Sequence, residues 1–243
     1  MTVPTAVGLG MITPSSNTVL EPTTVAMLRD LPEVTAHFAR FRVLEISDSV
    51  TALQQFDQEP MLEAARLLAD ARVKAIAWNG TSAGWLGFHR DEELCRRIEA
   101  ETDIPAASSV LALNEVLRCK DVTRLGLVTP YLSAIQDGII ANYRGIGIDV
   151  VADRRLEDPG NWSFATYDEA TIAAMIRDVA LARPQAITML CTNFRGAALA
   201  ADLEAELSIP IYDSVATAVW QSLRLAGFDP RRVTGWGSLF ALI

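Results

Sequence analysis

The chain has 243 residues, 50% of them hydrophobic, and a formal net charge of −9. This length suits one domain or two small ones with a sizeable core. The acidic balance argues against binding to nucleic acid or to an anionic membrane, because both surfaces need clustered Lys and Arg. The three cysteines show no disulfide spacing, the N-terminus lacks the regions of a signal peptide, and no apolar stretch reaches the roughly 18–20 residues of a membrane span. We therefore expect a cytoplasmic protein.

Strands and helices are predicted to alternate along the first half of the chain. Val7–Thr13 is a short apolar run that predicts a buried strand, followed by a loop that begins at Pro14. Asp57–Ala71 carries apolar residues at helical spacing, and the apolar run Val73–Trp78 after it predicts a strand. The other predictions for this half are a helix within Leu20–Arg29, a strand at Val34–Val43, a helix at Asp91–Glu101, a strand starting at Ile104 and a helix at Val110–Cys119.

The second half is predicted to follow the same order. Its strands are expected at Arg124–Thr129, Ile148–Ala152, Ala186–Leu190 and Ile209–Tyr212, and its helices at Ala134–Arg144, Asp168–Ala182, Ala197–Glu206 and Ala216–Ala226. Strands that alternate with helices favour an α/β architecture, with parallel sheets and helices on both faces.

The two halves also match each other in sequence. Three pairs of segments align in the same order: Leu9–Pro14 with Leu125–Pro130, Ala75–Ser82 with Ala186–Asn193, and Ile104-Pro105 with Ile209-Pro210. This internal repeat predicts two pseudo-symmetric, doubly wound parallel-sheet halves with the site in the cleft between them. We place the first half at residues 1–120 and the second at 121–219, with the segment from about 220 to 243 packing back on the first.

The matched segments end in polar residues at the carboxyl ends of predicted strands, where open α/β sheets bind their ligands. Cys191-Thr192-Asn193 follows one such strand, and Gly80-Thr81-Ser82 follows its twin. Cys191 would therefore stand on one wall of the cleft and Gly80 on the other. A two-sided acid/base site would then have kept a sulfur on one side only.

Cys191 is the main catalytic candidate. An ordinary thiol, with a pKa near about 8.5, is mostly protonated at neutral pH and can donate a proton, whereas a nearby helix N-terminus would favour a thiolate nucleophile. The alternative is a buried, inert thiol, which is the usual fate of a lone cysteine. Cys95 and Cys119 do not follow strands, and we interpret both as structural.

The other candidates are hydrogen-bonding groups around that cysteine. Gly80-Thr81-Ser82 offers backbone N–H groups and two hydroxyls to a carboxylate or oxyanion, or else forms only a capped turn. Ser16 and Asn17 either bind a substrate carboxylate or cap the next helix, and Tyr131 either binds substrate or packs in the core. Asn161 lies in a polar stretch that is either a lid over the cleft or a plain surface loop.

No metal or cofactor is predicted. The two histidines, His37 and His89, lie near no cysteine or carboxylate at metal-ligand spacing. The chain has no phosphate-binding loop, no dinucleotide fingerprint and no Gly-x-Ser-x-Gly elbow. The large residues Trp78 and Trp85 either line the pocket or pack in the core.

Together these residues resemble the aspartate/glutamate racemase superfamily, and within it the branch that holds arylmalonate decarboxylase and maleate cis-trans isomerase. The resemblance runs from Val7 to about Gly237. It implies two pseudo-symmetric α/β halves that close over a small acid. Racemases and isomerases of this kind carry one cysteine per half, whereas the decarboxylases keep only the second and have Gly-Thr-Ser at the first position.

The resemblance also implies roles for individual residues. Gly80-Thr81-Ser82 and Cys191 match the decarboxylase pattern, although Thr192 and Asn193 stand where the decarboxylases have two glycines. Tyr131 is similar to the tyrosine of their oxyanion-binding set. Pro14–Thr18 is similar to an isomerase loop whose asparagine grips a carboxylate, and Asn161 to a second such asparagine. The substrate-binding candidates are Pro14, Ser16, Asn17, Gly80, Thr81, Ser82, Tyr131, Asn161, Thr192 and Asn193.

Three functions follow as hypotheses. The first is cofactor-independent decarboxylation of a substituted malonate or related diacid, in which Cys191 protonates an enediolate. The second is maleate cis-trans isomerisation or amino-acid racemisation, which needs a sulfur on each wall, and Gly80 removes one. The third is a carboxylate-binding protein that kept the fold without catalysis. Each predicts a small-molecule carboxylate as partner; a homo-oligomer would be ordinary for such an enzyme, although no sequence feature indicates one.

Overall fold

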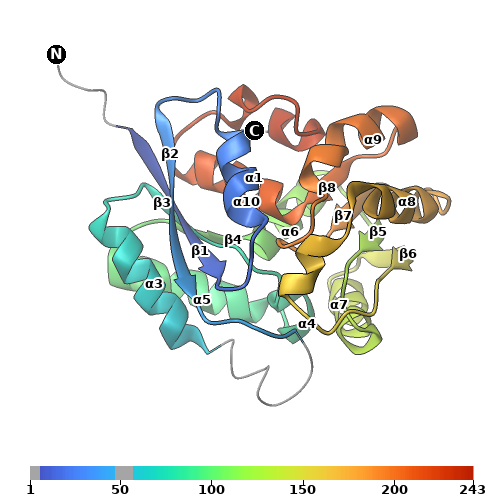
Figure 1. Ribbon diagram of the computed structural model, residues 1–243, viewed down its shortest axis with the longest axis horizontal. Coiled ribbons are helices and arrows are strands. Elements are labelled where there is room, and N and C mark those ends of the chain that lie inside the picture. Colours follow the sequence, from blue (N-terminus) through green and yellow to red (C-terminus); the bar gives the residue numbers. More distant parts are fainter. Residues whose placement is uncertain (1–5, 47–56, 243) are drawn as a thin grey trace.

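The computed structural model describes residues 6–46 and 57–242, and two parallel β-sheets organise it (Figure 1). Residues 1–5, part of the stretch examined for a signal peptide, lie outside the described residues. The first sheet has the order β2-β1-β3-β4 and consists of β1 (Val7–Pro14), β2 (Val34–Phe41), β3 (Ala75–Trp78) and β4 (Ala106–Ser108). The second has the order β6-β5-β7-β8 and consists of β5 (Arg124–Val128), β6 (Asp149–Arg154), β7 (Ala186–Met189) and β8 (Ile211–Asp213).

The two sheets share one topology, which confirms the predicted pair of pseudo-symmetric α/β halves. Matching β1–β4 with β5–β8 in chain order gives the same strand order, and all neighbouring strands are parallel. Even single hydrogen bonds recur: the backbone N–H of Asn79 donates to Ile12 (3.0 Å), and that of Leu190 donates to Val128 (3.0 Å). The repeat in sequence is therefore a repeat of backbone pairing.

Helices cover both faces of the sheets. The α-helices are α1 (Leu20–Met27), α3 (Gln58–Asp70), α4 (Ala83–Leu86), α5 (His89–Thr102), α6 (Ser109–Cys119), α7 (Ser133–Gly145), α8 (Glu169–Ala180), α9 (Ala200–Leu207) and α10 (Ser214–Leu225). Short 3-10 helices are η1 (Trp162–Thr166), η2 (Ala197–Leu199), η3 (Pro230–Arg232) and η4 (Ser238–Ala241). α3 and α5 pack together on one face of the first sheet, and α1 and α10 pack together on the other. α10 thus follows a strand of the second sheet but packs on β3 and β4 of the first.

Two helices at the interface between the halves begin with a side-chain cap. The Ser108 hydroxyl accepts a hydrogen bond from the backbone N–H of Leu111 (3.0 Å) at the start of α6. Asp213 caps α10 in the same way, with its Oδ1 accepting from Val215 and Ala216. Such caps satisfy backbone donors that have no partner inside the helix. Because each cap directly ends the fourth strand of its half, α6 and α10 start at equivalent places.

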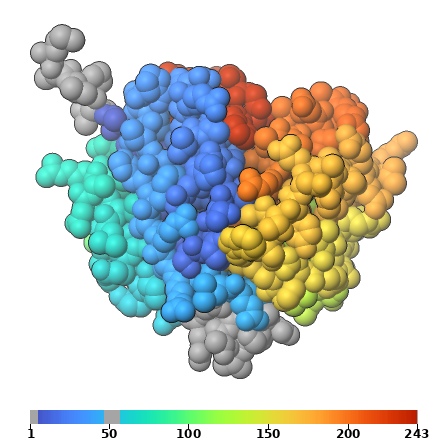
Figure 2. Space-filling view, viewed as in Figure 1, coloured from blue at the N-terminus to red at the C-terminus, as the bar shows by residue number. Residues whose placement is uncertain are grey.

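The halves lie directly against each other through two helix pairs. α4 packs on α7, where the Asn142 amide donates to the backbone oxygen of Gly84 (2.9 Å), and α6 packs on α10, where the Thr217 hydroxyl donates to the backbone oxygen of Ser109 (3.0 Å). In Figure 2 the blue first half and the yellow and orange second half meet without a gap on the face shown. Within the described ranges, no helix has the length and apolar character to cross a membrane.

Most predicted elements are present with ends shifted by a few residues, and the short elements α4, η1, η3 and η4 were not predicted. α4 has four residues, too few to show a helical period in sequence. η1 directly follows Asn161 and the polar stretch that was expected to be a lid or a surface loop. The predicted helix Ala197–Glu206 begins as the 3-10 turn η2 before α9, a common form of a first helical turn.

Candidate functional site

A small cavity lies where the carboxyl ends of β1, β3, β5 and β7 meet. Its volume is about 20 Å³, enough for about one water molecule. It is lined by Pro14, Val43, Ile46, Trp78, Gly80, Thr81, Ser82, Trp85, Tyr131, Asn161, Cys191, Thr192 and Asn193. All predicted site residues line it except Ser16 and Asn17. The two halves therefore bring together side chains that are far apart in the sequence.

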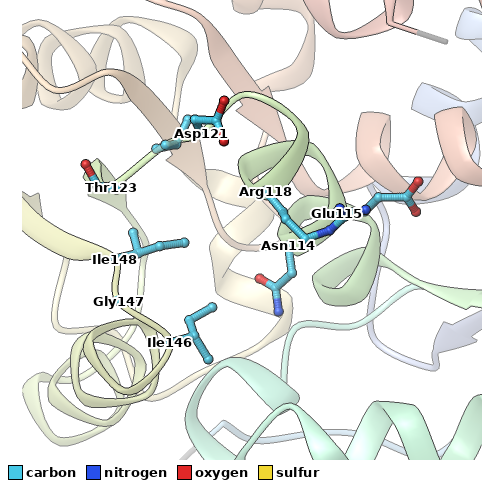
Figure 3. Close-up of a pocket in the computed structure, with 9 residues that line it drawn as sticks. Asn114, Glu115, Arg118, Asp121, Thr123, Ile146, Gly147 and Ile148 are labelled. Atoms are coloured by element: carbon cyan, nitrogen blue, oxygen red, sulfur yellow. The ribbon is translucent and has the colours of Figure 1, made fainter.

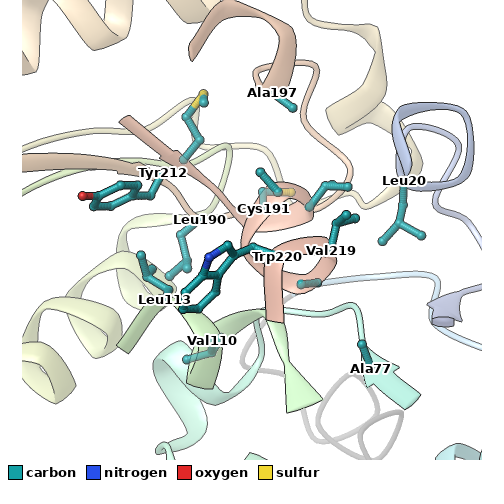
Figure 4. Close-up of a cluster of buried hydrophobic side chains, with 14 of the residues drawn as sticks. Leu20, Ala77, Val110, Leu113, Leu190, Cys191, Ala197, Tyr212, Val219 and Trp220 are labelled. Atoms are coloured by element: carbon teal, nitrogen blue, oxygen red, sulfur yellow. The ribbon is translucent and has the colours of Figure 1, made fainter. Parts of the chain in front are cut away.

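Cys191 lies in a dry environment just beyond β7. It is 3% exposed and belongs to the buried hydrophobic cluster drawn in Figure 4. Burial raises the pKa of its thiol to about 12, and the negative charges of Asp213 and Asp158 act in the same direction. The Tyr131 hydroxyl and a backbone N–H oppose this rise by bonding the sulfur. The thiol is therefore protonated at neutral pH, as a proton donor must be.

Tyr131 connects the two walls of the cavity. Its hydroxyl is 2.6 Å from the Thr81 hydroxyl, which belongs to the first half, and it also lies beside the Cys191 sulfur of the second. The ring is fixed by edge-on packing against Trp85 (5.4 Å between centroids) and Phe164 (5.5 Å). Burial raises the pKa of Tyr131 well above its usual value. The tyrosine is thus a rigid, protonated hydrogen-bond donor next to the thiol.

Gly80, Thr81 and Ser82 form the wall that faces Cys191. The turn into α4 is held by main-chain bonds, since the backbone N–H groups of Gly84 and Leu86 donate to Thr81 and Ser82 (both 2.9 Å). No side chain caps this short helix. The hydroxyls of Thr81 and Ser82 are therefore not needed to hold the turn, and Gly80 presents no side chain at all.

Ser16 and Asn17 are used in internal contacts and do not line the cavity. The Ser16 hydroxyl donates to the backbone of Val43 (2.7 Å). The Asn17 oxygen accepts from the backbone N–H groups of Val19 (3.0 Å) and Leu20 (2.9 Å) at the start of α1, while its amide donates to Thr192 (3.1 Å). Substrate binding by these two residues stays a prediction, and the capping alternative describes how Asn17 is placed here.

Asn161 carries a free donor at the cavity. It is 6% exposed, and its backbone oxygen accepts a hydrogen bond from the Asn193 amide (2.6 Å). Among the described residues its own Nδ2 has no partner, although buried donors are nearly always paired. The turn before it is held by Asp158, which accepts bonds from Gly160 (2.8 Å) and Tyr167 (3.1 Å). An oxygen of a bound ligand would satisfy this amide.

Asn193 and Thr192 are buried within contacts between the halves. The Asn193 oxygen accepts from the backbone N–H of Thr18 (2.9 Å), and the Thr192 hydroxyl donates to the backbone of Asn79 (3.0 Å). These hydrogen bonds connect the second half of the chain to the first at the cavity. Both residues line the cavity, and the backbone N–H of Asn193 bonds the Cys191 sulfur.

Sequence reasoning missed the apolar wall formed by Val43 and Ile46, and it missed Asp213. Val43 and Ile46 lie beyond the end of β2 in irregular chain, which has no periodicity to identify them. Asp213, whose negative charge helps to raise the pKa of Cys191, had a signal in the sequence, because it directly follows the predicted strand Ile209–Tyr212. Within the described ranges, no group of three or more His, Cys, Asp or Glu side chains has the arrangement of a metal site.

A larger hollow of about 590 Å³ lies elsewhere, between the end of α6 and the turn after α7 (Figure 3). Asn114, Arg118 and Ile146 are among its lining residues, and it contains none of the predicted site residues. Glu115 at its edge is paired with Arg224 of α10. Size alone therefore does not identify the site, and the polar residues that converge on the small cavity do.

Replacing Asp213 with asparagine should stabilise the protein at pH 8 but not at pH 4. Burial raises the pKa of this carboxyl from 3.8 to about 7, although its two backbone bonds lower it. Between these values the folded chain binds a proton that the unfolded chain has lost, so stability falls as the pH rises. Removing the charge should gain up to roughly 4 kcal/mol at pH 8. Urea unfolding at both pH values measures this, and an equal gain at both would contradict it.

Comparison with known proteins places this site in a family. A family model for arylmalonate decarboxylase matches residues 9–240. Maleate isomerase of Pseudomonas putida is 25% identical in an alignment of 245 positions that covers 96% of each chain. Arylmalonate decarboxylase of Bordetella bronchiseptica is 24% identical over 188 residues, covering 75% of this chain and 77% of that one.

Solved structures agree with the sequence comparison. Maleate cis-trans isomerase of Nocardia farcinica superposes with a TM-score of 0.86 at 25% identity, over 96% of this chain and 97% of that one. Unliganded arylmalonate decarboxylase superposes with a TM-score of 0.80 at 22% identity, over 97% and 99%, which shows a shared fold. With nearly its whole length matched and its polar residues gathered at one cavity, the chain belongs to the arylmalonate decarboxylase family of enzymes.

Proposed function

We propose that this enzyme decarboxylates a substituted malonate or a related small diacid without a cofactor, and that Cys191 supplies the proton. The observation that carries the proposal is the buried thiol of Cys191, protonated at neutral pH and opposite a glycine. A thiol of this kind is a proton donor before it is a nucleophile, because nucleophilic attack needs the thiolate. With Gly80 on the other wall, a proton can be delivered from one side only.

In the proposed reaction, one substrate carboxylate is held by the hydroxyls of Thr81, Ser82 and Tyr131. The other lies against the apolar side chains of Val43 and Ile46, where loss of water weakens the ionised ground state. The bond from the α-carbon to this carboxylate breaks, CO₂ leaves, and the electron pair moves into the remaining carboxylate to form an enediolate. Hydrogen bonds aimed at the developing charge stabilise it.

Cys191 then transfers its thiol proton to the α-carbon, and the resulting thiolate regains a proton from water. The Tyr131 hydroxyl beside the sulfur stabilises the thiolate in that interval. Substrate binding requires the cavity walls to separate, because the present volume of about 20 Å³ holds about one water. A single acid on one wall predicts a single product enantiomer.

Maleate-type isomerisation is the second candidate, and the unpartnered amide of Asn161 favours it. An amide N–H at this position suits a second carboxylate that stays on the substrate throughout the reaction. Relatives named maleate isomerase, such as that of Pseudomonas putida, cover nearly the whole chain. Against this candidate stand Gly80 in place of a second sulfur and the protonated state of Cys191.

The test is incubation of the purified protein with methylphenylmalonate, maleate and each aspartate enantiomer, followed by NMR in deuterated water. We expect CO₂ loss with one deuterium placed stereospecifically on the product. Fumarate formed from maleate would support the isomerase instead and overturn the decarboxylase. A folded protein that converts none of them, yet melts at a higher temperature with a dicarboxylate, would identify a carboxylate-binding protein.

A further inference from the structure

The side chain of Trp78 fills the place where a side chain of residue 80 would be. A Cβ built on Gly80 would overlap Cζ2, Cη2 and Cε2 of the Trp78 indole, which lies two residues earlier in the chain. The backbone of Gly80 is not in the left-handed region, so the glycine is not required by its φ angle. It is required by the indole that packs on its Cα.

Trp78 is fixed from several sides. It is 1% exposed, and its ring packs against Phe41 of β2 at 5.2 Å between centroids. It lines the site cavity, and it also lines a second cavity of about 10 Å³ behind the first wall. Within the Gly80–Ser82 wall, Ser82 also lines both cavities. Trp78 and Ser82 therefore form the partition between the two cavities.

Asp91 stands on the far side of that partition. This carboxyl, in the first turn of α5, is 2% exposed and faces the Ser108 hydroxyl and the indole N–H of Trp78. Among the described residues, neither Oδ2 of Asp91 nor Nε1 of Trp78 has a hydrogen-bond partner of good geometry. An acceptor and a donor thus lie beside one cavity whose volume is near the lower limit for a bridging water.

The second half, in contrast, leaves room for its sulfur. The internal repeat aligns Trp78 with Met189 and Gly80 with Cys191. A Cβ on Gly196 would overlap the Met189 thioether, so the methionine side chain packs on Gly196, and Met189 is not among the residues that line the site cavity. The residue two before Gly80 thus blocks a side chain there, whereas its counterpart in the second half, Met189, stands two before a position that holds a cysteine.

We propose that Trp78 is a specificity-determining residue, which excludes an acid from the first wall by occupying its place, and that Asp91 is the positioning residue that orients the indole through a water in the small cavity that both side chains line. The stereochemical part of this proposal rests on the proposed function, since one-sided protonation matters only if a carbanion is formed. The packing part does not depend on any reaction. Substituting Gly80 alone cannot then give a two-sided site, whereas substituting Gly80 and Trp78 together can.

The first experiment measures stability, and it is independent of activity. Gly80→Ala and Gly80→Cys should each lower the Tm by about 5 °C or more, as expected for overpacking. Gly145→Ala is the matched control, because a Cβ there meets nothing within 4 Å. In the Trp78→Met background, Gly80→Cys should lower the Tm much less than it does in the wild type. Additive effects, or a Gly80→Ala as stable as Gly145→Ala, would overturn the proposal.

Trp78→Met/Gly80→Cys reproduces the residue pair of the second half. If that double variant does not fold, the milder pair Trp78→Phe and Gly80→Ala tests the same coupling. With methylphenylmalonate, the wild type and Gly80→Cys should give one enantiomer, and the double variant should give both and exchange the product's α-hydrogen for deuterium. If no variant turns over any substrate while the stability coupling persists, the proposed function fails and the packing role of Trp78 stands.

The role of Asp91 is tested by the NMR signal of the Trp78 indole N–H, assigned through its loss in Trp78→Met. Asp91→Leu should shift or broaden this signal, because the acceptor is gone. Asp91→Asn keeps an oxygen acceptor and should restore the signal near its wild-type position. An unchanged signal in Asp91→Leu would show that Asp91 does not orient the indole.

Discussion

Replacing Cys191 with alanine should lower kcat for decarboxylation by about 10²–10⁴-fold, the usual contribution of a positioned general acid. The remaining turnover should lose its stereospecificity, because water would then protonate the enediolate. Cys191→Ser should be nearly as inactive, since a hydroxyl is a far weaker acid than a thiol. The measurement is CO₂ release together with the enantiomeric ratio of the product by NMR.

Cys119→Ser is the matched control for this substitution. Cys119 is exposed at the end of α6 and lies outside the cavity, so its replacement should leave both kcat and the enantiomeric ratio unchanged. A melting curve of Cys191→Ala separates loss of chemistry from loss of fold. A folded Cys191→Ala that still yields one enantiomer at the wild-type rate would remove Cys191 from the mechanism.

The fold was predictable because the information for it is periodic. Short, mostly apolar strands and amphipathic helices leave local patterns, and the repeat between Ala75–Ser82 and Ala186–Asn193 doubled the signal. The cavity followed from one topological rule, that ligands bind beyond the carboxyl ends of parallel strands. That rule alone brought Thr81, Tyr131 and Cys191 to the same cavity.

What sequence could not resolve are choices between two uses of one side chain. Asn17 has the same identity whether it caps α1 or holds a substrate, and only its hydrogen bonds distinguish the two. From the sequence, Asn161 could belong either to a surface loop or to a lid. Its burial depends on a hydrogen bond from Asn193, which lies beyond the end of β7 and is distant in sequence. From the sequence, Trp78 could either pack in the core or line the pocket. In the structure it does both, because its indole fits beside Gly80, which has no side chain.

Removing the hydroxyl of Tyr131 should have the second-largest effect on activity. Tyr131→Phe keeps the ring contacts with Trp85 and Phe164 but loses the 2.6 Å hydrogen bond to Thr81. If this hydroxyl stabilises the enediolate, kcat should fall by about 10²–10³-fold, with KM changed much less. The Tyr131 hydroxyl also lowers the pKa of Cys191, so its loss should raise that pKa further and weaken the acid. Steady-state kinetics on the substrate found in the NMR panel measure both parameters.

Tyr143→Phe provides the matched control for Tyr131→Phe. Tyr143 is likewise fully buried and packs edge-on against an aromatic ring, that of Phe88, but it lies away from the cavity and its hydroxyl has no hydrogen-bond partner among the described residues. Removing an unpaired buried hydroxyl should leave kcat unchanged and stability equal or higher. If Tyr131→Phe behaved like this control, the charge of the enediolate would have to be held by Thr81, Ser82 and backbone N–H groups alone. The loss of activity would then appear in Thr81→Val instead, because that substitution removes the hydroxyl on the opposite wall while keeping the shape of the side chain.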